Sequence, residues 1–132
     1  MEFAGNREQQ SSSGIIVSTG LGSTGWLKSV ISGASNIVNY LSGKEFNFQR
    51  EIQLNWNNDY LYYSVREPFP RKTSQTNLVF GKITKDCPLR IFSLMPENGV
   101  IFSDGIENDF VQFNSGIEAT VTLAEKKGHL IV

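Results

Sequence analysis

The hydrophobic pattern of this chain changes its period once, near residue 45. Beyond that point apolar and polar residues alternate, which is typical of half-buried β-strands. Before it, apolar residues recur every three or four positions, as on one face of an α-helix. The residues with helical spacing are Trp26, Leu27, Val30, Ile31, Ala34, Ile37, Val38 and Leu41. Because Gly33 interrupts this face, and Gly costs about 1 kcal/mol relative to Ala in a helix, we expect one helix or two short ones.

The fold class predicted from these patterns is mainly β, an antiparallel, distorted sandwich with the helix placed after a glycine-rich turn. A short β-branched strand is expected at 14–19, and the polar residues 1–13 are expected to form a loop or frayed arm. Asn98-Gly99 and Asp104-Gly105 are typical of tight hairpins with positive φ. The strands expected after residue 45 are 48–54, 60–65, 77–83, 89–95, 100–103, 110–113, 117–123 and 129–131.

Length and charge limit the class of protein. The 132 residues predict a single domain, 1–132, and the formal net charge of −1 argues against a nucleic-acid partner or an anionic membrane surface. Cys87 is the single cysteine and His129 the single histidine, so neither an internal disulfide nor a structural zinc site is expected. With no run of 18 apolar residues and no signal-peptide pattern, we expect a soluble protein of a reducing compartment, the cytoplasm.

The segment between the first strand and the helix is rich in glycine, from Gly20 to Gly25. Glycines allow a sharp turn and a close approach to a ligand, and the N–H groups at the start of a helix favour negative charge. The spacing fits the dinucleotide pattern G-x-G-x-x-G, and Glu45 lies 20 residues further on. That pattern needs a parallel βαβ unit, which the alternating region does not predict. The phosphate-loop pattern fails, because Trp26 stands where lysine is needed, and glycines that serve close packing alone remain an alternative.

Residues 18–26 read Ser-Thr-Gly-Leu-Gly-Ser-Thr-Gly-Trp behind the strand, which resembles the S-T-P-T-G-S-T-A-Y signature of the NAD kinase family. Ser29 stands where that family has a serine in the first helical turn. Arg66-Glu67-Pro68-Phe69-Pro70 resembles the family's threonine- and proline-rich loop, and Ser103-Asp104-Gly105 its late V-D-G hairpin. The resemblance covers the chain from about residue 13 to its end, as the family's C-terminal domain.

The resemblance implies a function. NAD kinases phosphorylate the 2′-hydroxyl of the adenosine ribose of NAD to give NADP, with ATP or polyphosphate as donor and a divalent metal such as Mg²⁺. Their catalytic aspartate lies in a G-G-D-G motif of an N-terminal α/β domain, so no catalytic residue is expected in this chain. The C-terminal domain supplies much of the NAD pocket, and a homo-oligomer completes it. The substrate-binding residues implied here are Gly22, Ser23, Thr24, Gly25, Trp26, Ser29, Ser13 and Asp104.

This chain departs from the family pattern at several positions. The G-G-D-G motif is absent, Ser13 replaces an aspartate before the strand, and Gly25-Trp26 replaces Ala-Tyr. These changes leave NADH, NADP or another nucleotide open as ligand. Two alternatives are a diverged or non-catalytic nucleotide-binding β module and the C-terminal domain of a lipid kinase of the diacylglycerol or sphingosine type.

Each candidate group also has an ordinary structural interpretation. Trp26 is expected either to stack on a ligand ring or to anchor the helix in the core. Asp104 fits either a ribose contact or a hairpin turn. The basic residues around Pro68-Phe69-Pro70, Arg66 among them, fit either a pyrophosphate contact or a solvated loop. The aromatic residues Trp56, Tyr60, Tyr62 and Tyr63 fit a sheet face with ordinary packing better than a base-stacking surface.

Overall fold

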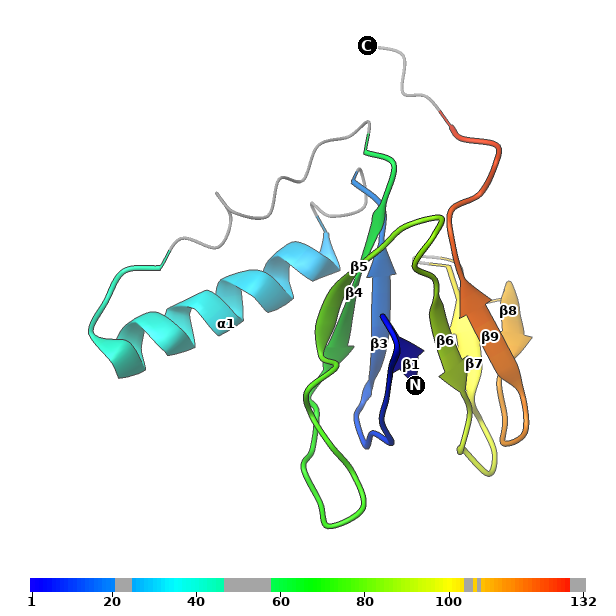
Figure 1. The fold of residues 1–132 in the computed structure, drawn as a ribbon, viewed down its shortest axis with the longest axis horizontal. Helices are drawn as coiled ribbons and strands as arrows, with labels where there is room; N and C mark the ends of the chain where they lie inside the picture. Colours follow the sequence, from blue (N-terminus) through cyan, green and yellow to red (C-terminus); the bar gives the residue numbers. More distant parts are fainter. Residues whose placement is uncertain (21–24, 47–57, 104–105, 107, 129–132) are drawn as a thin grey trace.

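The computed structural model describes residues 1–20, 25–46, 58–103, 106 and 108–128. Within them the chain is mainly β, with one helix and only antiparallel strand pairs (Figure 1). This confirms the predicted fold class. The elements are β1 (Glu2–Phe3), β2 (Asn6–Arg7), β3 (Gly14–Ser18), α1 (Trp26–Ser42), β4 (Leu61–Arg66), β5 (Phe80–Ile83), β6 (Leu89–Phe92), β7 (Val100–Phe102), β8 (Phe110–Gln112) and β9 (Glu118–Val121).

The strands form three open sheets. The orders are β2-β1-β6-β9, β3-β4-β5 and β7-β8. The central strand β4 pairs with β3 in a register that sets Val65 opposite Ile15, and with β5 in a register that sets Tyr63 opposite Gly81. In the four-stranded sheet, Ile91 of β6 lies opposite Ala119 of β9. Strands that are distant in sequence are therefore neighbours in both larger sheets.

The core lies where the three-stranded and four-stranded sheets pack together. Alternate residues of β4 point into it, because successive side chains of a strand face opposite sides of the sheet. Tyr63 is fully buried, and its ring meets Phe3 edge to face with the ring centres 4.9 Å apart. The core consists of Tyr63, Val65, Ile83 and Leu89, with Met1, Phe3, Ile15, Leu61, Val79, Ile91 and Val121 packed around them.

The helix α1 is continuous from Trp26 to Ser42, so the alternative of two short helices is wrong. It ends at Gly43, whose φ of 64° lets its N–H bond the Asn39 carbonyl over 3.1 Å. Only its N-terminal half is buried, at Leu27 and Ile31 beside β3. Figure 1 shows the rest running away from the sheets, and Leu41 is 77% exposed there. No helix within the described ranges is long and apolar enough to cross a membrane.

The prediction of a loop or frayed arm at residues 1–13 is wrong for residues 2–7, whereas residues 8–13 form a loop as expected. Residues 1–8 contain the β1–β2 hairpin, whose turn residues Ala4 and Gly5 have φ of 49° and 77°. Two-residue strands are too short to show a hydrophobic period, and their order comes from pairing with β6. The expected strands 48–54 and 129–131 and the turn Asp104-Gly105 lie outside the described residues.

Asn98-Gly99 does not close a tight hairpin, although Asn98 has the expected positive φ, 61°. It connects β6 to β7, and these strands pair with β9 and β8 instead. The expected strand 89–95 also ends early, at Phe92, and the hydroxyl of the next residue, Ser93, donates to the Phe113 carbonyl over 2.6 Å. The strands expected at 77–83 and 117–123 are likewise shorter, at Phe80–Ile83 and Glu118–Val121.

Candidate functional site at the start of the helix

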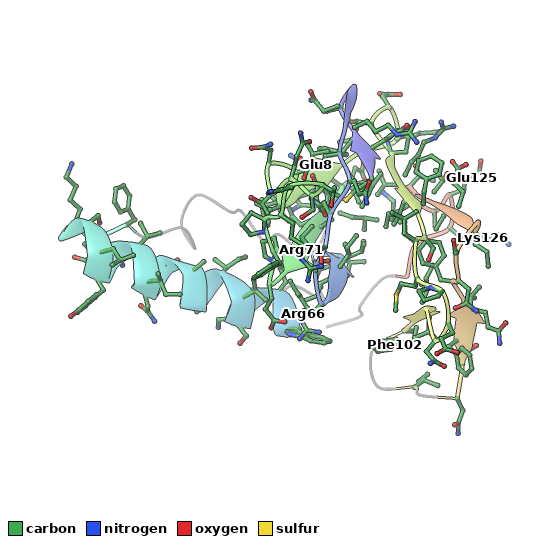
Figure 2. All side chains as sticks on the ribbon, turned by 90° about the horizontal axis from the view of Figure 1, so that it is seen from below. Glu8, Arg66, Arg71, Phe102, Glu125 and Lys126 are labelled. Atoms are coloured by element: carbon green, nitrogen blue, oxygen red, sulfur yellow. The ribbon has the colours of Figure 1, made fainter. Side chains whose placement is uncertain are left out.

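The start of α1 meets the end of β4 through a stacked pair of side chains. The guanidinium carbon of Arg66 lies 4.3 Å from the centre of the Trp26 ring. Figure 2 shows Arg66 beside the first turn of α1. Trp26 is 43% exposed whereas Leu27 is buried, so Leu27 rather than Trp26 anchors the helix. A cation over an aromatic face is an attractive contact, and it holds both flat groups at the surface.

Ser13 contacts the main chain of the same arginine. Its backbone N–H and its hydroxyl both donate to the Arg66 carbonyl, over 3.1 and 3.4 Å. Two of the residues implied as substrate-binding therefore contact Arg66, Ser13 at its main-chain carbonyl and Trp26 at its guanidinium. We refer to Ser13, Trp26, Arg66 and Glu67 as the Arg66 cluster.

Glu67 completes this cluster and has an unusual backbone. Its carboxylate lies 3.6 Å from the Arg66 guanidinium, and its side chain is 72% exposed. Its φ is 44°, in the left-handed region that residues with a side chain rarely adopt. Such conformations cost energy and concentrate at functional sites, so the loop that begins at Glu67 is a place to expect a ligand.

The loop that follows Glu67 is bound along its length to the N-terminal segment. The Phe69 N–H donates to the Ser11 carbonyl over 2.7 Å, and the Gln75 N–H donates to the Gln9 carbonyl over 2.9 Å. Within the loop, the Ser74 hydroxyl donates to the Phe69 carbonyl over 2.8 Å. These bonds fix the loop next to the Arg66 cluster, which is why residues 9–13 are not a frayed arm.

Glu8 anchors the far end of that loop. It is only 6% exposed, and its carboxylate accepts bonds from the backbone N–H groups of Leu78 and Asn77, over 2.8 and 3.2 Å. The Gln10 side-chain amide also donates to it. Burial raises the pKa of Glu8, but the hydrogen bonds from Gln10, Leu78 and Asn77 outweigh burial and lower the pKa below its ordinary value. Sequence reasoning missed Glu8, because its donors are backbone groups far along the chain.

The other implied site residues divide into two groups. Ser29 is exposed one turn after Trp26, and its N–H bonds the Gly25 carbonyl over 3.4 Å. Gly25 occupies the cap position of α1, where it has no side chain to bond the first helical N–H groups. Gly22, Ser23, Thr24 and Asp104 lie outside the described residues, as does Trp56.

The remaining aromatic residues of β4 have ordinary packing partners. Tyr62 stacks on Phe80 with ring centres 5.3 Å apart, and Tyr60 meets Tyr62 edge to face. An open pocket of about 430 Å³ lies elsewhere, beside the β1–β2 turn. Its two arginines, Arg7 and Arg90, already pair with Glu2 and Glu118, and no member of the Arg66 cluster lines it.

Among the residues that the structure describes, no three histidine, cysteine or acidic side chains are grouped to hold a metal ion. Compared with models of protein families, with curated proteins and with solved structures, the chain has no significant match in any of the three.

Proposed function

We propose that this chain binds a dinucleotide of the NAD type at the Arg66 cluster and the adjoining glycine-rich turn. It would serve as the substrate-binding domain of an NAD kinase-like enzyme, a homo-oligomer in the cytoplasm. The observation that carries the proposal is the contact of Arg66 with both Ser13 and Trp26. The strand, the turn and the first helical residue resemble the NAD kinase signature, and Arg66 contacts Ser13 before the strand and Trp26 after the turn.

The chemistry of the cluster suits a dinucleotide. Trp26 offers an exposed aromatic ring on which a base or a nicotinamide can stack. The Arg66 guanidinium offers a planar fork of donors that matches phosphate. Ser13 and Ser29 are exposed hydroxyl residues, suited to ribose hydroxyls.

In the proposed enzyme these residues bind and orient NAD. Holding the adenosine ribose in one place presents its 2′-hydroxyl to a catalytic aspartate of an α/β domain, and such positioning lowers the barrier to transfer from ATP or polyphosphate. On its own, the chain is expected to bind NAD without phosphorylating it.

A two-dimensional NMR titration with NAD, NADP and ATP tests the proposal. We expect saturable shifts at the Trp26 indole N–H and the amides of Gly25 and Ser29, with no shift at Trp56. A Trp56→Phe variant assigns the two indole signals. A folded chain that shows no shift at millimolar NAD or NADP would refute the proposal. A response to diacylglycerol-containing vesicles, with none to NAD, would favour the lipid kinase alternative.

A further inference from the structure

Arg66 has one anionic and one aromatic partner within the cluster. Its guanidinium lies 4.3 Å from the centre of the Trp26 ring and 3.6 Å from the Glu67 carboxylate. The arginine side chain is 29% exposed and the Glu67 side chain 72% exposed. The indole and the strand thus hold the guanidinium in place, while the carboxylate approaches it from solvent.

The pairing between Arg66 and Glu67 is a weak one. At 3.6 Å the two groups are beyond the range of a good charge-assisted hydrogen bond, and an exposed ion pair contributes little to stability. The pyrophosphate of a dinucleotide carries two negative charges against the one of a carboxylate, and its oxygens can form two short parallel bonds with a guanidinium, which Glu67 does not form at 3.6 Å. A phosphate group that reaches Arg66 can therefore displace Glu67 at little cost.

We propose that Arg66 binds a phosphate group of the ligand, and that Glu67 is the carboxylate which this phosphate displaces. Glu67 then sets the affinity of the site for anions, because its negative charge must leave the guanidinium or remain and repel the phosphate. This inference rests on the proposed function for its natural ligand, a nucleotide with a phosphate next to a stacked ring.

Arg71, in the loop that follows β4, provides a matched comparison. Arg71 lies over the Phe69 ring, 5.1 Å from its centre, so it is also an arginine on an aromatic face. It differs in two ways, because it contacts neither of the residues implied as substrate-binding, Ser13 and Trp26, and no ion pair with Glu67 is formed there. If any exposed arginine in or beside this loop attracted phosphate equally, Arg71 would do so as well as Arg66.

Calorimetric and NMR titrations with three probes test the proposal. The probes are inorganic pyrophosphate, NAD and adenosine, which has no phosphate. The variants are Arg66→Gln, Glu67→Gln, Arg66→Lys and the control Arg71→Gln. We expect Glu67→Gln to strengthen binding of pyrophosphate and NAD by about two- to fivefold, the range of an exposed ion pair. We expect Arg66→Gln to weaken it by roughly tenfold, as befits a lost charge-assisted bond, with partial recovery in Arg66→Lys.

We expect the affinity for adenosine to be the same in every variant. We expect Arg71→Gln to bind all three probes as tightly as the natural sequence does. If the role of Arg66 were merely structural, Arg66→Gln would weaken the binding of all three probes alike. Thermal melting shows whether each variant is folded. Because Glu67 is exposed, Glu67→Gln keeps the fold and tests the proposal even if Arg66→Gln does not fold.

The outcomes separate this inference from the proposed function. If NAD still shifts the Trp26 signal but binds with the same affinity in Glu67→Gln and Arg66→Gln as in the natural sequence, the inference is overturned, and the part of the proposed function that stands is NAD binding at Trp26. If pyrophosphate binding follows the expected pattern while NAD binds no more tightly than pyrophosphate, the inference is supported and the dinucleotide function fails. If neither phosphate-bearing probe shifts the Trp26 signal, both are overturned.

Discussion

The Glu8 carboxylate accepts a hydrogen bond from the backbone N–H of Leu78 over 2.8 Å, across 70 positions of the chain. The Gln10 side chain bonds the Leu78 carbonyl over 2.9 Å, so both backbone groups of Leu78 are tied to the N-terminal segment. Leu78 lies at the end of the loop that starts with Glu67 and leads into β5. A buried carboxylate outside the Arg66 cluster therefore holds the loop that shapes it.

Glu8→Gln should destabilise the fold. The neutral amide replaces charge-assisted bonds with weaker ones and sets one of its own donors against the N–H groups of Asn77 and Leu78. We expect the free energy of unfolding to fall by about 1.5–3 kcal/mol, measured by urea denaturation at pH 7. Glu125→Gln, at an exposed residue, is the control and should change it little. Equal stability of the two variants would contradict the assigned role of Glu8.

Because of the same carboxylate, we expect the free energy of unfolding to fall at acid pH. Its pKa is lowered in the folded state, despite burial, by the bonds from Gln10, Leu78 and Asn77. The stabilisation from Glu8 is therefore complete above its ordinary pKa of 4.5 and is lost as pH falls through the lower folded value. Denaturation curves between pH 7 and pH 3 should show this loss in the natural sequence. In Glu8→Gln, the free energy of unfolding should decrease less over the same pH range.

Because of Tyr63, we expect the protein to lose stability at alkaline pH. Burial, and then the nearby Glu8 and Cys87, raise the pKa of its phenol to about 12 from 10.0. The unfolded chain loses this proton first, so the free energy of unfolding should fall as pH rises from about 10 to about 12. Tyr63→Phe should remove that part of the fall, which denaturation across this pH range measures.

At neutral pH the same substitution tests a buried polar atom. The Tyr63 hydroxyl has no hydrogen-bond partner among the described residues, although the side chain is fully buried. Removing it should leave the free energy of unfolding unchanged or raise it by up to about 1 kcal/mol. Tyr40→Phe, at a residue 89% exposed, is the matched control. A loss of more than about 1 kcal/mol in Tyr63→Phe would show that the hydroxyl is bonded after all.

Periodicity predicted the elements that form a continuous pattern. The expected strand 60–65 is β4 displaced by one residue, and the helical spacing from Trp26 to Leu41 is α1. Alternation along β4 also places the apolar Tyr63 and Val65 on the core face, although Ser64 on the other face is buried as well. These features depend on neighbours in sequence, which is the information that a single chain carries.

Contacts between distant residues could not be predicted in the same way. Residues 1–13 are held in place by β6 and by the loop after Glu67. The N-terminal sequence contains no pattern that would predict contacts with either of them. The sequence places Arg66 in a basic, proline-containing loop that resembles one of the NAD kinase family, but no spacing rule joins it to Trp26. The turn that resembles the NAD kinase signature was the strongest sequence signal, and its central residues Gly22, Ser23 and Thr24 lie outside the described part of the chain.

We expect replacement of glycine by alanine to have opposite effects on stability at Gly81 and at Gly33. A Cβ at Gly81 would come within 2.5 Å of the Tyr63 ring and 2.7 Å of the Phe3 ring, so Gly81→Ala should destabilise the protein by about 1–3 kcal/mol. A Cβ at Gly33 would meet nothing within 4 Å, so Gly33→Ala should stabilise α1 by about 0.5–1 kcal/mol. Thermal denaturation measures both, and a common sign would contradict the packing at one of the two sites.

Ala4 offers a test of the hairpin that the sequence did not predict. Ala4 and Gly5 have φ of 49° and 77°, the left-handed pair of a type I′ turn between β1 and β2. Alanine is poorly suited to this conformation whereas asparagine adopts it readily, so Ala4→Asn should raise the free energy of unfolding by about 1 kcal/mol. Ala4→Pro should lower it, because proline fixes φ near −65°. If the N-terminal segment were frayed, neither substitution would change the melting temperature. A rise with Asn and a fall with Pro would show that residues 2–7 are folded as part of the four-stranded sheet.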